Sequence, residues 1–188
     1  MTAPSVDRAE RLYSPREVDA ALDRMAADIA RRLSGRDCVV LSLLQGGIVP
    51  TGMLLPRLDV SLELDSVHVT RYRNTTRGGD VEWRTHPRTP IKDRHVLLID
   101  DILDEGHSLA AVRAWCRAEG ARDVLIAVLV DKEHDRKHPE VVADFVGLQV
   151  PDRYVFGYGM DYRGWYRNAP GIFALAGAAP ATDGDRED

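Results

Sequence analysis

Three aspartates in the middle of the sequence are the side chains best suited to chemistry. Residues 95–99 are typical of a buried strand, and Asp100, Asp101 and Asp104 occupy three of the next five positions. In open α/β sheets, ligands bind at the carboxyl ends of the strands. Carboxylates there accept hydrogen bonds from hydroxyl groups, bind divalent cations and exchange protons. The three aspartates therefore predict a site for a polyol, a metal ion or both.

The residues after the aspartates add a place for an anion. Gly106 and Ser108 precede a pattern that predicts a helix over residues 109–119. Backbone N–H groups at a helix N-terminus attract phosphate, and the Ser108 hydroxyl can donate a further hydrogen bond. Carboxylates repel a neighbouring phosphate unless they face hydroxyls, a metal ion or a proton. A sugar phosphate meets both conditions, and a solvated acidic turn before an ordinary helix is the alternative.

Alternating strands and helices are predicted to position these residues. Ser14, Pro15 and Glu17 have the types and spacing of a helix N-cap with a capping box, and the helical pattern continues to Leu33. Apolar runs predict strands over residues 38–44, 62–72, 95–99, 124–130 and 143–146, with an outgoing loop over 100–108. This alternation predicts an α/β fold with a central parallel sheet and helices on both of its faces.

A basic, turn-rich segment interrupts this pattern. Residues 71–94 contain seven Lys or Arg and three acidic residues, although the chain as a whole has a net charge of −5. Such a segment indicates an anionic ligand. Residues 74–90 are polar and contain several glycines and prolines, which predicts a long hairpin or a mobile loop.

The composition limits the class of protein. The 188 residues are 44% hydrophobic and 29% charged, which suits one folded domain and excludes wholesale disorder. No apolar run approaches the roughly 20 residues that span a bilayer, and no secretory signal is present, so we expect a cytoplasmic protein without membrane contact. Cys38 and Cys116 are too few for a disulfide framework. The histidines show no paired metal-ligand spacing and receive no role.

Four segments, taken in order, resemble motifs of the type I phosphoribosyltransferases. Residues 96–109 are similar to the signature that binds phosphoribosyl diphosphate (PRPP), and Leu44-Gln45-Gly46-Gly47 is similar to the pyrophosphate loop. Val130-Asp131-Lys132 resembles the segment with the purine-contacting lysine. Residues 150–162 resemble the base-binding hood of hypoxanthine-guanine phosphoribosyltransferases, and Tyr166-Arg167 fits as well. The matches extend from about residue 39 to residue 173.

The resemblance implies a particular organisation of the fold. A central parallel sheet flanked by helices would carry a small hood, formed from both ends of the chain, and a long mobile loop. We expect a single domain over 1–188, with its core at about 36–148 and the hood at about 1–14 and 149–175. Residues 176–188 have the composition of a disordered tail. A lid over about 72–85, with Arg71 and Tyr72, would close over the site and exclude water.

The resemblance also implies an activity. The enzyme would transfer the 5-phosphoribosyl group from PRPP to N9 of hypoxanthine or guanine, giving IMP or GMP and pyrophosphate, with Mg²⁺ as cofactor. A homodimer or homotetramer is expected, without a nucleic-acid partner. Two alternatives stay open at this point: a phosphoribosyltransferase that prefers another base such as xanthine, and a nucleotide-sensing RNA-binding regulator with the same fold. The acidic net charge disfavours the regulator.

The family motifs assign a role to each matching residue. Asp100 and Asp101 would hold the ribose hydroxyls and organise Mg²⁺–PRPP, and Asp104 would be the general acid/base at purine N7. The 5′-phosphate would contact Asp104, Glu105, Gly106, His107, Ser108 and Leu109. Pyrophosphate would contact Leu44, Gln45, Gly46 and Arg167. The purine would contact Lys132, Tyr154, Val155 and Asp161, and the Mg²⁺ ligands would be Asp100, Asp101 and Asp161.

Two positions depart from the family pattern. Glu105 stands where a small hydroxyl residue is usual, and a carboxylate that pointed inward there would oppose the phosphate. We expect its side chain to point outward and its backbone N–H to face the phosphate. Arg71 replaces the usual small residue before the tyrosine of the lid.

Overall fold

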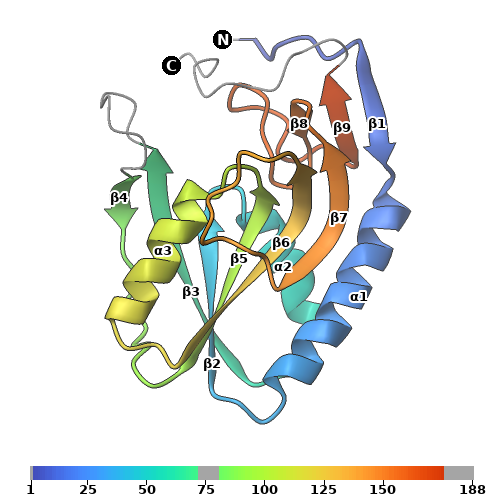
Figure 1. Ribbon diagram of the computed structural model, residues 1–188. Helices are drawn as coiled ribbons and strands as arrows, with labels where there is room; N and C mark the ends of the chain where they lie inside the picture. The colour runs from blue at the N-terminus through green and yellow to red at the C-terminus, as the bar shows by residue number, and fades with distance from the viewer. Residues whose placement is uncertain (1, 72–80, 176–188) are drawn as a thin grey trace.

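The central sheet contains six strands among residues 2–71 and 81–175, the parts of the chain that this computed structural model describes (Figure 1). Its strand order is β4-β3-β2-β5-β6-β7. All neighbouring pairs are parallel except the edge pair β3–β4. The strands are β2 Cys38–Leu44, β3 Leu62–Arg71, β4 Val81–Thr85, β5 His95–Leu103, β6 Asp123–Glu133 and β7 Phe145–Pro151.

The predicted α/β fold, with a central parallel sheet flanked by helices, is confirmed, and one pair at the edge of the sheet is antiparallel. Strand β4 is antiparallel to β3, and Arg71 lies opposite Val81. Only residues 72–80 connect the two strands, and a parallel neighbour needs a crossover of roughly a dozen residues or more. Residues 72–80 lie outside the described residues, as does the side chain of Arg71, so only the β4 portion of the expected lid can be placed.

Helices cover both faces of the sheet, as expected. They are α1 Pro15–Leu33, α2 Ile48–Leu54 with the 3₁₀ helix η1 Leu55–Arg57, and α3 His107–Ala118. The predicted capping box starts α1: the Ser14 side chain accepts from the Glu17 N–H, and the Glu17 carboxylate accepts from the Ser14 N–H at 2.8 Å. Both ends of α1 match the prediction.

Side chains that alternate along the strands divide the core into two clusters. Leu97 and Ile99 of β5 pack with residues of α1 and α2, whereas Val96 and Leu98 pack with residues of α3. Successive residues of a strand point to opposite faces, so a strand covered on both faces needs an unbroken apolar sequence. The helices are thereby fixed to a sheet whose carboxyl edge carries the aspartates.

A second, antiparallel sheet lies beyond the carboxyl ends of the central strands (Figure 1). It consists of β1 Ala9–Tyr13, β8 Val155–Phe156 and β9 Ile172–Leu175 in the order β1-β9-β8. Its residues Val155 and Ile172 belong to the same hydrophobic cluster as Leu22 of α1. We call the β1-β9-β8 sheet and its connecting loops the hood. The 176–188 tail lies outside the described residues.

Several elements are longer than predicted, and β5 is the important case. It continues through Asp100 and Asp101 to Leu103, whereas the sequence predicted that it ends at residue 99. The extra residues pair with β6, with Ile102 opposite Val130, and Leu103 is 2% exposed. Strand pairing and burial therefore outweigh the acidic residues. Likewise β6 extends to Glu133, α3 begins at His107 rather than at 109, and β7 spans Phe145–Pro151 rather than 143–146.

Candidate active site

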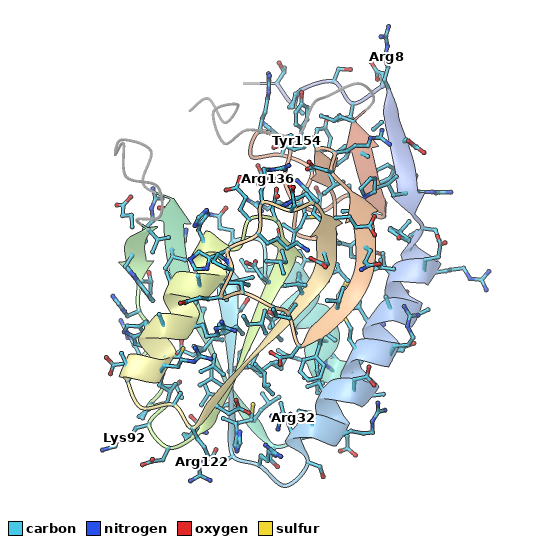
Figure 2. The ribbon with its side chains drawn as sticks, viewed as in Figure 1. Arg8, Arg32, Lys92, Arg122, Arg136 and Tyr154 are labelled. Carbon is cyan, nitrogen blue, oxygen red and sulfur yellow. The ribbon has the colours of Figure 1, made fainter. Side chains whose placement is uncertain are left out.

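The expected site residues gather where the carboxyl ends of β2, β5 and β6 face the hood. Figure 2 shows Arg136 and Tyr154 in this region, with Arg32, Lys92 and Arg122 at the opposite end of the molecule. Among the described residues, no helix is long and apolar enough to cross a membrane. Three groups of side chains can be distinguished at the edge of the sheet that faces the hood.

The first group contains the expected pyrophosphate loop and a ring of charges. The peptide bond between Leu44 and Gln45 is cis, and Gly46 lies so close to Asp101 that an added Cβ would be 2.0 Å from its Oδ2. Any side chain at position 46 would collide with this carboxylate. Glycine is therefore required where the loop passes β5.

Asp101, Asp161 and Arg167 complete this first group. Arg167 Nη2 is 2.7 Å from Asp161 Oδ1, and Arg167 Nη1 is 3.9 Å from Asp101 Oδ2. The backbone holds the arrangement, because Arg167 also donates to the Gly159 carbonyl and the Gly164 N–H donates to Asp161. Residues far apart in the sequence thus form one charged cluster.

Burial dominates the electrostatics of the paired aspartates. It raises the pKa of Asp100 well above its usual value, and the neighbouring charge of Asp101 raises it further. Burial also raises the pKa of Asp101, although Arg167 opposes that effect. A cation close to these two carboxylates would stabilise their ionised forms.

The carboxylates of this group suit a Mg²⁺ ion that is bound together with a substrate diphosphate. No group of three or more His, Cys, Asp or Glu among the described residues is arranged to hold a metal ion. Mg²⁺ typically binds through one or two carboxylates, water and substrate phosphates. Asp100, Asp101 and Asp161 offer hard oxygen ligands with incomplete charge compensation, so they fit an ion that arrives with a diphosphate.

The second group surrounds Asp104, just after β5. Lys132 Nζ is 2.5 Å from Asp104 Oδ2, and His134 Nε2 is 2.7 Å from Asp104 Oδ1. Burial favours the neutral acid, but the hydrogen bonds from Lys132 and His134 and the charge of Lys132 outweigh it and lower the pKa of Asp104. Asp104 is therefore an ionised carboxylate with a separate donor at each oxygen.

His134 is a site residue that the sequence reasoning missed. The highly charged segment 131–138 is typical of a solvated loop, yet Lys132 is only 3% exposed and the His134 side chain is also 3% exposed. Residues two apart on a strand point to the same face, and the end of β6 places Lys132 and His134 on one side. That spacing was the available signal.

The third group is the loop and first turn of α3. Gly106 has φ +82°, a conformation that favours glycine, and an added Cβ would be 2.9 Å from Leu103. His107, Ser108 and Leu109 form the first turn of α3, where N–H groups are available to an anion. Glu105 Oε2 is 3.3 Å from His107 Nε2, and its side chain is 34% exposed. The Glu105 side chain therefore lies beside His107 of the same turn, and its expected orientation away from a bound phosphate stays a prediction.

The expected purine-binding residues of the hood form a buried wall. Tyr154 is 9% exposed and packs edge-on against Tyr162, with their ring centroids 5.3 Å apart. Val155 pairs with Ala174 of β9. Asp161 belongs to the first group through its ion pair with Arg167. Strand β3 ends at Arg71, and Tyr72 is outside the described residues.

Known proteins share both the sequence and the fold. Residues 9–163 match the family described as the phosphoribosyl transferase domain. A hypoxanthine-guanine phosphoribosyltransferase of Bacillus subtilis is 33% identical over 165 residues, which are 87% of this chain and 91% of that protein. A similar protein of Streptococcus pneumoniae with the same name is 32% identical over the same shares of the two chains.

Solved structures support the same relationship. A hypoxanthine phosphoribosyltransferase from Staphylococcus aureus has a TM-score of 0.83 and 29% identity, covering 88% of this chain and 90% of its own. One from Trypanosoma cruzi, in a ternary complex with substrates, has a TM-score of 0.84 and 28% identity, covering 90% and 96%. The ordered motifs, the fold and these matches show that the chain belongs to the phosphoribosyltransferase family.

Proposed function

We propose that this protein is an oxopurine phosphoribosyltransferase that converts hypoxanthine or guanine and PRPP to IMP or GMP and pyrophosphate. The observation that carries the proposal is the pair formed by Asp104 and Lys132, 2.5 Å apart at the base of the hood. An oxopurine presents N7 and a 6-oxo oxygen next to each other. A carboxylate for N7 and an ammonium for the oxygen complement these two atoms.

Lys132 supports selection of oxopurines over adenine. Its ammonium is donor-only, so it can bond a 6-oxo oxygen but not the 6-amino group of adenine. Lys132 is 3% exposed, and a mismatch at a buried donor is not compensated by water. Tyr154, Val155 and Asp161 supply the rest of the proposed base-binding pocket.

The other groups of the site suit PRPP. The 5′-phosphate would bind at the N-terminus of α3. The residues in contact with it would be Asp104, Glu105, Gly106, His107, Ser108 and Leu109. Asp100 and Asp101 would accept hydrogen bonds from the ribose hydroxyls. Pyrophosphate would lie along Leu44, Gln45 and Gly46, with Arg167 as the opposing cation.

Mg²⁺ completes the proposed site. Asp100, Asp101 and Asp161 would hold it with oxygens of the substrate, and when bound it would supply positive charge to the departing diphosphate. The crowding of the two adjacent aspartates supports this role, because burial raises the pKa of both and a bound cation would favour their ionised forms.

Asp104 is the proposed general base of the forward reaction. The bond between N9 and C1 of the ribose forms, the bond between C1 and the pyrophosphate oxygen breaks, and the N7 proton of the purine passes to Asp104. The lowered pKa of Asp104 supports this step, because a base must be ionised before it accepts a proton. The hood and the lid, which Arg71 and Tyr72 would join, exclude water from the cation-like ribose.

Steady-state kinetics with hypoxanthine, guanine, xanthine and adenine test the proposal, each with PRPP and Mg²⁺. We expect turnover of hypoxanthine and guanine, and none of adenine. D104N should lower kcat by about 10²–10⁴-fold while IMP still binds, because general acid–base catalysis contributes about that much. D28N, on the exposed side of α1, is the matched control. Activity on adenine alone would refute the base assignment, and preferred turnover of xanthine would revise it.

The cytoplasmic location and the dimer or tetramer stay predictions. Both are consistent with a salvage enzyme that uses small phosphorylated substrates.

A further inference from the structure

We propose that His134 is a positioning residue that holds the Asp104 carboxylate by a hydrogen bond to Oδ1, so that Oδ2 alone faces the purine. This inference rests on the proposed role of Asp104 and extends it to a side chain for which the family motifs predict no role. Three observations support it: the position of the imidazole, the contacts of its neighbours, and the fact that Lys132 contacts the other oxygen of Asp104.

The imidazole is built into the site rather than lying near it by chance. Its side chain is 3% exposed, and Nε2 is 2.7 Å from Asp104 Oδ1. The backbone N–H of Arg136 donates to His134 Nδ1 at 3.1 Å. Because Nδ1 accepts this hydrogen bond, the ring proton is assigned to Nε2, which then donates to Asp104.

The segment that carries His134 is itself held from two sides. Arg136 forms two hydrogen bonds with Asp152, at 2.8 and 2.9 Å, just before the hood strand β8. The His138 N–H donates to the Glu105 carbonyl at 2.7 Å. The segment therefore links the loop before β8 to the phosphate loop, and these links fix the backbone from which the imidazole reaches Asp104.

Lys132 alone cannot keep Asp104 in place during the reaction. Its ammonium lies on Asp104 Oδ2, and the proposed function requires the same ammonium to donate to the purine 6-oxo oxygen. When a purine binds, part of that bond is redirected. The separate bond from His134 to Oδ1 is unaffected by the purine, so it keeps the carboxylate oriented toward N7.

The expected pH dependence follows from the groups around Asp104. The charged and titratable groups that act on it are Lys132 and His134, with Arg136 at longer range. Without the His134 hydrogen bond, the ionised form of Asp104 is less favoured and its pKa rises. Because the base must be ionised, the acid limb of the kcat/KM profile should move to higher pH.

Three variants of His134 separate this role from general packing. H134F fills the space but removes the donor, H134N retains an amide too short to reach Asp104, and H134Q places an amide donor near the position of Nε2. We expect kcat of H134F and H134N to fall roughly 10–100-fold, as for loss of a hydrogen bond to a charged group, with the KM for PRPP nearly unchanged. H134Q should recover most of kcat.

The matched control is H86Q, which makes the same change at a histidine stacked on Trp83 at the far edge of the sheet. We expect H86Q to keep wild-type kcat and pH profile. Circular dichroism and IMP binding would verify the fold of each variant, and H134N replaces H134F if the bulkier side chain prevents folding.

Direct titration of the Asp104 carboxyl carbon by ¹³C NMR makes the test independent of turnover. A raised pKa in H134F or H134N, restored in H134Q, supports the proposal. An unchanged Asp104 titration and an unmoved acid limb would overturn it, as would equal losses of kcat in all three variants. If the wild-type chain turned over no oxopurine although the Asp104 titration responded to His134, the proposed function would fail while the contact stood.

Discussion

Glu105 shows how one side chain can set the properties of a phosphate loop. Its carboxylate lies 3.3 Å from His107 Nε2, within the turn that begins α3. A phosphate bound at the N-terminus of α3 has to approach both residues, and Glu105 opposes it while His107 can donate to it. The pair therefore reduces the positive potential of the loop without removing its backbone donors.

E105T tests this balance between repulsion and contact. Removing the charge should lower the KM for PRPP by about two- to fivefold, because a partly exposed charge pair contributes up to roughly 1 kcal/mol. PRPP saturation curves measure the change, and E119T at the C-cap of α3 is the matched control. A decrease of 50-fold or more would mean that Glu105 points directly at the phosphate, and an increase would mean that it assists binding.

Individual site residues could be predicted where a motif contains them, but their contacts could not. Gly46 was expected to approach pyrophosphate, yet its lack of a side chain is also required by Asp101 of another strand. The one signal for His134, its spacing of two residues from Lys132, indicates burial only when the extent of β6 is known. Contacts between strands depend on register, which the local sequence does not contain.

At the scale of elements, local signals were reliable wherever the cause was local. The capping box of α1 is formed by Ser14 and Glu17, three residues apart, and the structure has it as predicted. The predicted end of β5 at residue 99 was wrong, because the last residues of the strand are stabilised by pairing with β6, with Leu103 opposite Asp131. The short strand β4 lies in the polar segment for which a long hairpin or a mobile loop was predicted, and it is stabilised by pairing with β3.

S14A tests the importance of the cap. Loss of the Ser14 side chain leaves an N–H of α1 without its acceptor, so the free energy of unfolding should fall by about 1 kcal/mol. Urea denaturation followed by circular dichroism measures the difference. S34A, at the other end of α1 and exposed, should change stability by only a few tenths of a kcal/mol, as expected of surface substitutions. Equal effects of the two variants would contradict the capping argument.

At the scale of the molecule, the hood and the central sheet share one hydrophobic cluster. Ile172 and Met160 of the hood pack in the same cluster as Val18 and Leu22 of α1, and Leu97 of β5 belongs to it too. A common core couples the two sheets energetically. The proposed base-binding wall should therefore unfold together with the PRPP-binding edge rather than before it.

I172A tests this coupling. Ile172 is fully buried, so truncation should lower the free energy of unfolding by about 2–4 kcal/mol. Calorimetry should show a single transition that moves to lower temperature. I48A, whose side chain is 54% exposed, is the control and should move the transition little. A separate early transition for the hood in I172A would contradict the shared core.

The pairing of β1 with β9 has a consequence for the order of events during protein synthesis. Ala9 lies opposite Leu175, and the Tyr166 hydroxyl donates to the Pro4 carbonyl. The first strand, β1, therefore cannot pair until β9 has been synthesised. On the ribosome, every strand of the central sheet emerges before β9 does. Because the two sheets share one hydrophobic cluster, the central sheet gains its full stability only after β9 has emerged and paired with β1, so the last part of synthesis determines when the chain can act.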